Sequence, residues 1–483
     1  MTQEEVASSS SITGATALPD INPKVEDLKA SRKTGKSYRH TFPVHTESKP
    51  SPLSKEAPPE SYRGFVNLGL LLLFGNNVRL IIENYQKYGI LISLPGSNIS
   101  REDWLLTGLA HVLLPLNVIV SFQVERLAKK WTVGLRKRLA DTSTRTVGAD
   151  DQDPKHRLKE AYKAEATAKR FQSVVGWVHT FIVLMIISWP SYMSYYKIYH
   201  PFLSMTCLIN GTIMFFKMTS YALVHQDLRA AYIFDEPEET FHHLTKVHHS
   251  NSARKEKEEE EVKDEVYQYD VHYPDNVTFL NMAYFWLAPT LCYQPSYPRT
   301  KIFRKSFFVK RALEFITCVG MMYFLIEQYA TPTLQNSIRA VDRLDFGTML
   351  ERILKLSTTS VLIWLLMFYT FFHAAFNFLA EMLYFGDRCF YMAWWNAGSV
   401  AMYWRLWNKP IYTFFKRHVY LPLIMRGVSP LMASLTIFTI SAVMHEIVVG
   451  LPTHTLYGYA FGGMFFQIPL IALTRPLEKW RGA

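Results

Sequence analysis

The sequence has few cysteines and no recognisable nucleotide or metal motif. Only 4 of its 483 residues are cysteine, and their scattered positions show neither a CxxC pair nor metal-ligand spacing. That excludes a disulfide-stapled or zinc-binding scaffold and indicates reduced packing residues. We also find no P-loop, no dinucleotide-binding glycine pattern in a suitable context, no Ser-His-Asp order and no His/Asp cluster at metal spacing. The sequence therefore predicts no metal and no bound cofactor.

Charged residues are also scarce, and the apolar residues are unevenly distributed. Charged residues make up 19% of the chain and apolar residues 49%, and the mean hydropathy is close to zero. This average conceals apolar blocks of about 18–22 residues, long enough to cross the roughly 30 Å core of a bilayer as helices. The pattern predicts an all-α polytopic membrane protein, and it excludes both a soluble globular enzyme and a disordered chain.

Eight stretches are expected to span the membrane. They cover residues 65–82, 104–123, 173–189, 202–224, 312–329, 360–380, 433–450 and 456–474. Residues 1–60 are rich in Ser, Thr, Pro, Lys and Glu, which predicts a disordered tail. The membrane-embedded domain then covers residues 61–483, and its first span also serves as the targeting signal.

The basic residues predict the orientation. The net charge is +11, and many lysines and arginines lie at 125–170, beside predicted spans. The positive-inside rule puts this loop, the N-terminal tail and the loops 225–300 and 381–432 in the cytosol. Charge in these places suits anionic lipid surfaces better than nucleic acid. Asn98 begins a glycosylation sequon on the predicted lumenal side, and Asn276 begins one on the cytosolic side.

His445 and Glu446 lie inside the seventh predicted span. Two ionisable groups in a membrane helix are costly unless they face a polar cavity or a partner, so they form a functional hypothesis. Histidine also has the pKa best suited to a general base near neutrality. The alternative is a structural histidine bonded to a carbonyl of a neighbouring helix.

An aromatic and cationic segment covers residues 385–420. Its prominent members are Trp394, Trp395, Asn396, Trp407, Asn408 and Tyr420. Dense aromatic residues beside a membrane commonly form an interfacial belt. The accompanying asparagines and cations also suit an adenine ring and phosphates, through stacking and charge pairing.

Gln467 lies at membrane depth in the eighth predicted span. Alone it is as readily explained by helix–helix hydrogen bonding, but beside the span of His445 it indicates a shared polar cavity. Lys217 is expected to snorkel or to pair within the bundle. The histidines at 242, 243, 248 and 249 belong to a charged loop and are expected to be solvated.

The block Phe390-Tyr-Met-Ala-Trp-Trp-Asn396 resembles the FYxDWWN motif of the membrane-bound O-acyltransferase superfamily, in its sterol and diacylglycerol branch. Further stretches are similar to the type 1 acyl-CoA:diacylglycerol acyltransferases. They begin at Tyr62, Asn77, Lys87, Tyr273, Ala288 and Pro332, and the resemblance covers about residues 61–475.

The resemblance implies a multi-helix bundle in the endoplasmic reticulum around an intramembrane reaction chamber. Such an enzyme moves an acyl chain from acyl-CoA, its co-substrate, to diacylglycerol, without a cofactor and as a homodimer or homotetramer. His445 matches the general base and Asn408 the second essential polar residue. Glu446, Met464 and Gln467 match positions that line the chamber. Trp394, Trp395, Asn396, Trp407 and Tyr420 match the acyl-CoA-binding segment.

The sequence departs from the family pattern at two places. Ala393 replaces the acidic residue of the motif, which removes a carboxylate that would orient its neighbours or a cation such as Arg388. The family normally continues through a ninth helix with another polar residue, whereas this sequence ends at Ala483. We therefore keep three alternatives: a sterol or long-chain alcohol as acceptor, an inactive membrane scaffold, and a lipid-binding or transport protein.

Overall fold

The computed structural model describes residues 44–45, 47–52, 54, 56–57, 60–75, 85–89, 91, 99–145, 154–233, 271–342 and 345–481. Within these ranges the chain is helical, and pairing between extended segments is limited to two isolated bridges, Lys49 with Asp387 and Arg299 with Phe385. This agrees with the predicted all-α class. Most of the predicted tail, Asn98 and the four histidines at 242–249 lie outside the described residues.

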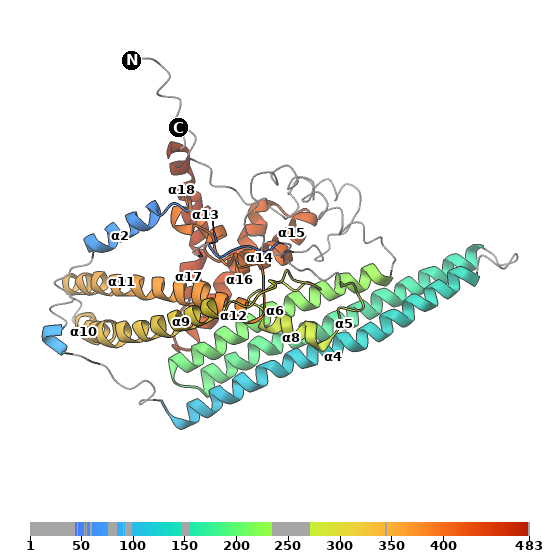
Figure 1. The fold of residues 1–483 in the computed structure, drawn as a ribbon, viewed down its shortest axis with the longest axis horizontal. Coiled ribbons are helices and arrows are strands. Elements are labelled where there is room, and N and C mark those ends of the chain that lie inside the picture. Colours follow the sequence, from blue (N-terminus) through green and yellow to red (C-terminus); the bar gives the residue numbers. More distant parts are fainter. Residues whose placement is uncertain are drawn as a thin grey trace, which may run out of the picture.

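Three long helices form one side of the molecule. They are α4 (Arg101–Arg145), α5 (Pro154–Tyr196) and α6 (Pro201–Ile233), and each packs against the other two. Figure 1 shows α4 and α5 running side by side beyond the end of α6. The cytosolic loop predicted at 125–170 is largely helical, because α4 and α5 continue through it on both sides of residues 146–153, and its side of the membrane stays a prediction. Its many Lys, Arg, Ala and Leu residues are strong helix formers, and their charges remain solvated on a projecting hairpin.

Apolar packing holds these helices to the rest of the chain. The main hydrophobic cluster joins Leu114 of α4, Ile186 of α5 and Met218 of α6 to Phe285 of the short helix α8 (Phe279–Leu287). Lys217 lies in the same region, and its ammonium donates to the carbonyls of Phe285 (2.8 Å) and Ala288 (2.6 Å). Its pairing within the bundle is thereby confirmed.

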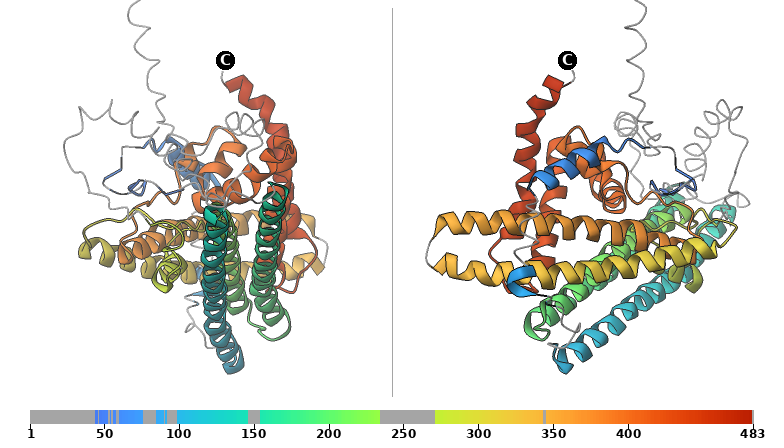
Figure 2. Two further views of the ribbon diagram at one scale, coloured as in Figure 1. Left: turned by 90° about the vertical axis from the view of Figure 1, so that its right-hand side faces the viewer. Right: turned by 60° about the vertical axis from the view of Figure 1, so that its left-hand side comes forward.

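Two further rods lie across this group (Figure 2). The first consists of α9 (Lys305–Leu325), the π-helical turn η1 (Ile326–Ala330) and α10 (Thr331–Asp342). The second consists of α11 (Phe346–Phe368), the π-helical turn η2 (Tyr369–Ala375) and α12 (Phe376–Met382). The two rods pack against each other along their lengths.

The C-terminal part contains a series of short helices, then one long helix and two shorter helices after it. The predicted loop 381–432 includes η3 (Trp394–Asn396), α13 (Val400–Leu406), α14 (Lys409–Phe415), η4 (Lys416–Tyr420) and α15 (Leu421–Met425). Then come α16 (Pro430–Gly450), α17 (Tyr459–Phe465) and α18 (Gln467–Arg481). Near the N-terminus lies α2 (Arg63–Gly75).

Five of the described helices are long and apolar enough to cross a membrane, fewer than the eight expected. They lie at 101–138, 165–196, 201–233, 346–382 and 430–450, and each contains one predicted span. Of the predicted span 65–82, the structure describes only the part in α2. The predicted span 312–329 falls in α9 and η1, which are not among these five helices. The predicted span 456–474 is broken at Phe466. Pro469, in the first turn of α18, explains the break, because proline lacks the N–H that would continue the helix.

Contacts between connecting segments fit the prediction that successive segments lie on opposite sides of the membrane. Segments expected on the lumenal side meet each other: the Tyr199 N–H donates to Asp103 (2.9 Å), and the rings of Tyr195 and His454 lie 4.9 Å apart. On the opposite side His45 contacts both Thr290 and Asp387. Described residues N-terminal to the boundary predicted at residue 60 therefore already pack on the rest of the chain.

Candidate active site

His445 lies near the C-terminal end of α16. This helix begins at Ser429, whose hydroxyl accepts the Met432 N–H (3.3 Å). The His445 Nδ1 lies 2.7 Å from the Ser441 carbonyl oxygen, one turn earlier. A carbonyl oxygen can only accept, so the neutral ring carries its proton on Nδ1 and keeps the lone pair on Nε2. Nε2 is therefore the atom that can take a proton from a substrate.

The side chain of His445 is exposed in the described part of the chain. The expected enclosed chamber around it is thus not formed by the described residues, which leave the ring uncovered. A hollow of about 770 Å³ lies elsewhere, along the α9 residues from Lys305 to Cys318. The described residues thus leave the His445 ring accessible on a membrane helix, and they do not show the predicted cavity.

Glu446 has a structural role that the sequence did not reveal. Its carboxylate accepts the backbone N–H groups of Gly458 (2.8 Å) and Phe461 (2.9 Å). These groups belong to the first turn of α17, whose N–H groups would otherwise lack partners. Both oxygens are thus engaged in attaching α17 to α16, and a role for Glu446 in lining a chamber stays a prediction.

Asn408 caps the start of α14. Its Oδ1 accepts the Ile411 N–H (3.1 Å), and Pro410 follows within the first turn. With one lone pair of Oδ1 engaged in this cap, Nδ2 is the group through which Asn408 can donate to a ligand. The next residue, Lys409, is a cation whose pKa is lowered by burial.

The structure brings the helices of Asn408 and His445 together. Ile411 of α14 and Met444 of α16 pack into one hydrophobic cluster with Phe414 and Phe415. Ile411 lies three residues after Asn408 and Met444 directly precedes His445, so both predicted catalytic residues lie close in sequence to residues that pack on this cluster. The sequence alone placed them 37 positions apart without a reason to meet.

Met464 and Gln467 flank the break between α17 and α18. Met464 is buried, whereas Gln467 is half-buried and donates through Nε2 to the Gly463 carbonyl (3.2 Å). Gln467 therefore satisfies backbone at the end of α17. Its expected contribution to a polar cavity remains a prediction.

The tryptophans of the motif are packed within the protein. Trp394 is buried in the main cluster, edge-on to Trp364 and Phe368. Trp407 stacks on Tyr403 at 6.2 Å between ring centroids. An exposed interfacial belt is excluded for Trp394, and stacking of this indole on adenine would require it to leave the cluster.

Trp395 and Asn396 hold the start of the membrane domain. The Trp395 indole N–H donates to the Ser61 carbonyl (3.2 Å), and Asn396 Oδ1 accepts the Gly64 N–H (3.1 Å). Phe65 packs on the Trp395 ring at 4.2 Å. Two residues predicted to bind acyl-CoA thus also bind the chain's own residues 61–65.

Ala393 does not leave Arg388 without a carboxylate. Arg388 Nη2 pairs with Glu381 Oε2 at 2.5 Å, and both side chains are buried. Ala393 packs against the main hydrophobic cluster. The expected loss of a partner for Arg388 is therefore wrong, because α12 supplies the negative charge.

Two polar networks were missed by sequence reasoning. One joins Glu125, His179 and Arg229 at the core of α4, α5 and α6, and the other joins His45, Thr290 and Asp387. The first carried a signal, since ionisable residues near apolar spans need partners. The second joins residues from three distant segments and had none.

The chain is similar to proteins of known family. A family model described as MBOAT, membrane-bound O-acyltransferase family, matches residues 168–480. Diacylglycerol O-acyltransferase 1C of Glycine max is 35% identical over 455 residues, which cover 92% of this chain and 75% of the relative. Diacylglycerol O-acyltransferase 1 of Arabidopsis thaliana is 33% identical over 451 residues, which cover 92% of this chain and 73% of the relative. Diacylglycerol O-acyltransferase 1 of Homo sapiens is 33% identical over 420 residues, which cover 86% of this chain and 75% of the relative. The matched region contains α16 and the motif segment, and the chain belongs to the membrane-bound O-acyltransferase family.

Proposed function

We propose that this protein is an acyl-CoA:diacylglycerol O-acyltransferase, which forms triacylglycerol in a membrane. Relatives that carry this name are about one-third identical over most of the chain. The observation that carries the assignment to a site is His445, whose Nδ1 is bonded to the Ser441 carbonyl on a membrane helix. Its free Nε2 suits a general base in an oxygen-acyl transfer.

The reaction needs one proton transfer and no covalent enzyme intermediate, because the thioester is already activated. Nε2 of His445 removes the proton from the free hydroxyl of diacylglycerol as that oxygen attacks the thioester carbonyl. The new ester C–O bond forms and the C–S bond breaks. The thiolate of CoA leaves with the sulfur electron pair and takes up the proton. Asn408 Nδ2 is the proposed donor to the carbonyl oxygen as negative charge develops there.

A membrane location suits both substrates. The acyl chain and the diacylglycerol remain in hydrocarbon, while the CoA head group meets the segment that contains Asn396, Trp407 and Tyr420. Keeping the thioester in a site poor in water limits its hydrolysis. No cofactor takes part in this scheme.

The proposed location is the endoplasmic reticulum membrane, with the N-terminus and the motif segment in the cytosol. The basic residues of α4 and α5 support this orientation through the positive-inside rule. The contacts of His45 with Thr290 and Asp387 put the N-terminal region on the same side as both predicted cytosolic loops. A homodimer or homotetramer with bound lipids is proposed by family likeness.

An acceptor-competition assay tests this function. Purified protein is given radiolabelled acyl-CoA with diacylglycerol, a sterol or a long-chain alcohol, and the labelled lipids are separated. We expect label in triacylglycerol and little in the other esters. Label mainly in sterol or wax esters would change the acceptor, and no ester with any acceptor would favour the scaffold or transport alternative.

A further inference from the structure

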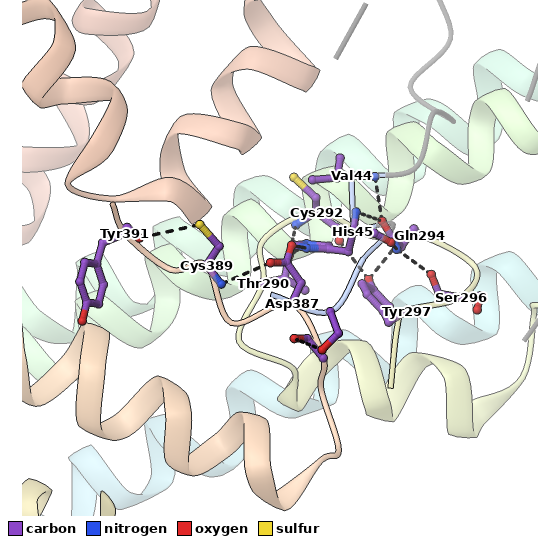
Figure 3. A network of polar contacts seen from close by, with 12 residues as sticks. Val44, His45, Thr290, Cys292, Gln294, Ser296, Tyr297, Asp387, Cys389 and Tyr391 are labelled. Carbon is purple, nitrogen blue, oxygen red and sulfur yellow. Dashed lines mark hydrogen bonds and ion pairs between the residues drawn. The ribbon is translucent and has the colours of Figure 1, made fainter. Parts of the chain in front are cut away.

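An N-terminal strap, here residues 44–45 and 47–52, lies across the segment that leads into the motif. Val44 and His45 donate their backbone N–H groups to Gln294 Oε1, each at 3.0 Å, and Gln294 Nε2 donates back to the His45 carbonyl (2.8 Å). One glutamine side chain thus pairs with the strap as a neighbouring strand would. Figure 3 shows this end of the strap beside residues 290–297.

The His45 ring joins the strap to two other segments. Its Nδ1 lies 2.5 Å from Asp387 Oδ2, and its Nε2 lies 2.7 Å from Thr290 Oγ1 (Figure 3). The side chains of His45 and Asp387 are only 13% and 14% exposed. Burial by itself would raise the pKa of the Asp387 carboxyl, but the neighbouring His45 holds it below its ordinary value. The carboxylate is therefore ionised and available to bind the ring, as a charge-assisted hydrogen bond requires.

Backbone pairing carries the strap along the segment 385–391. The Lys49 N–H donates to the Gly386 carbonyl (3.1 Å), and the Arg388 N–H donates to the Lys49 carbonyl (2.9 Å). A Cβ on Gly386 would lie 3.0 Å from the Pro298 carbonyl oxygen and 3.3 Å from Ser48 Oγ. The close approach at this position favours glycine.

The far end of the strap shares a buried partner with the motif. Ser51 Oγ and Tyr391 Oη lie 3.2 and 2.8 Å from the same atom, Nδ1 of His373. Asn377 Nδ2 also donates to Ser51 Oγ (3.2 Å). Tyr391 is the second residue of the motif, so strap and motif are held against one histidine.

The N-terminal region contacts the motif segment at both of its ends. The strap lies along residues 385–391, and Ser61 and Gly64 bind Trp395 and Asn396. Val44 also packs on Leu421, as does Tyr420. The segment between these anchors has little freedom to move while the anchors hold.

We propose that His45 and Asp387 are positioning residues for the acyl donor: their contact fixes the strap, and the strap fixes residues 390–396 in the conformation that binds acyl-CoA. This inference rests on the proposed function, which puts acyl-CoA at that segment. Neither side chain touches the reacting atoms, so their loss weakens donor binding and leaves the chemical step unchanged.

The first measurement is the equilibrium binding of radiolabelled acyl-CoA to purified protein, which needs no turnover. The variants are His45→Gln and Asp387→Asn, which alter the contact with little change in volume. The control is Glu47→Gln, an exposed residue of the same strap. We expect each of the two variants to raise Kd about tenfold, as suits the loss of one charge-assisted hydrogen bond, and the control to match the parent protein. The double variant should bind as weakly as either single variant, since both remove one contact.

The second measurement reports whether the strap is attached. Cys389 lies beside the contact between His45 and Asp387, and its backbone N–H donates to Asp387 Oδ1 (3.3 Å). Burial, together with the negative charge of Asp387, raises the pKa of the Cys389 thiol to about 11. We expect alkylation of Cys389 at pH 8, followed by mass spectrometry, to be faster in His45→Gln than in the parent or the Glu47→Gln control. Faster alkylation of Cys389 with an unchanged Kd for acyl-CoA would overturn the proposal. An unchanged alkylation rate together with an unchanged Kd would also overturn it.

Kinetics separate this inference from the function on which it rests. In the transfer assay the two variants should raise the KM for acyl-CoA and leave kcat within about twofold, a pattern of lost ground-state binding. A fall in kcat at constant KM would contradict a positioning role. If the parent protein transfers no acyl group, the proposed function fails, and the Kd comparison still decides the role of the strap.

Discussion

At the scale of single residues, backbone atoms determine what the site side chains can do. The Ser441 carbonyl fixes the proton of His445 on Nδ1, and the Ile411 N–H occupies Oδ1 of Asn408. Each bond lies within one turn of its own helix, so it is formed as soon as the helix is formed. The helices thus leave Nε2 of His445 able to accept a proton and Nδ2 of Asn408 able to donate, as the proposed roles of these residues require.

Replacing His445 with Ala should reduce kcat by roughly 10²- to 10⁴-fold, the usual contribution of a general base. Membrane insertion and acyl-CoA binding should persist, because the ring is exposed and adds little to packing. The matched control is Ser441→Ala, which removes a hydroxyl 3.5 Å from Nδ1 and keeps the carbonyl that fixes the tautomer. Steady-state rates measured on purified protein check both. Near-normal turnover without the imidazole would rule out its role as the base.

Gly64 gives a second prediction at this scale, since a Cβ there would lie 1.8 Å from the Trp395 carbonyl oxygen. Gly64→Ala should therefore separate residues 61–65 from Trp395 and lower the melting temperature. Gly69 lies in the same helix, and a Cβ added there would meet no atom of the described residues within 4 Å. Gly69→Ala should be neutral or stabilising by about 0.5–1 kcal/mol, through helix propensity. Thermal unfolding in detergent compares the two, and equal behaviour would argue against this contact.

At the scale of elements, α16 supplies the end group that α17 lacks. The helix α17 has seven residues and begins at Gly458, whose positive φ of 78° suits glycine. Its first N–H groups are bound by Glu446 from the preceding helix. A short helix is marginal by itself, so its stability depends on this carboxylate.

Glu446→Ala should destabilise α17, because it removes the group that caps this helix. The effect should be local, with faster hydrogen exchange of the peptide that covers residues 458–465. Glu446→Gln keeps one acceptor oxygen and should give an intermediate rate. Hydrogen exchange followed by mass spectrometry measures all three proteins. Unaltered exchange in the alanine variant would mean that α17 is held by packing alone.

At the scale of the whole molecule, one buried ion pair joins the three long helices. Arg229 of α6 binds Glu125 of α4, with Nη1 2.5 Å from Oε2, and both are 0% exposed. His179 of α5 donates to the same carboxylate at 2.7 Å, and Gln172 accepts from Arg229 at 3.1 Å. The network therefore fixes the register of α4, α5 and α6.

Removing one partner should be more harmful than removing both. Arg229→Leu leaves the buried Glu125 carboxylate without its arginine, with the His179 hydrogen bond remaining, and should cost about 3–5 kcal/mol. The double variant Glu125→Leu, Arg229→Leu buries no isolated charge from this pair and should recover part of that loss. Melting temperatures and the yield of folded protein in detergent test this order. A double variant less stable than Arg229→Leu would show that the pair stabilises beyond satisfying its own charges.

Much of the architecture could be predicted because it depends on local composition. An apolar stretch of about 20 residues favours a membrane helix whatever its neighbours are, and each of the five spans contains a predicted one. The ionisable pair at 445–446 was recognisable for the same reason, since its cost arises from the span itself. The break at Phe466 was missed because it depends on a proline near a helix start. The extension of α4 to residue 145 and of α5 back to residue 154 was missed because it depends on charged helix formers in an expected loop.

The sequence by itself determined the membrane class and most of the spans, and it indicated His445 as the candidate base. Only the tertiary structure decided the partners of the motif. His45 meets Asp387 across 342 positions, and Ser61 meets Trp395 across 334. Such pairs are chosen by how whole segments pack, and no periodicity along the chain encodes them. For the same reason Glu446, as polar as His445 in the sequence, is engaged as a helix cap, while the neighbouring imidazole keeps a free nitrogen.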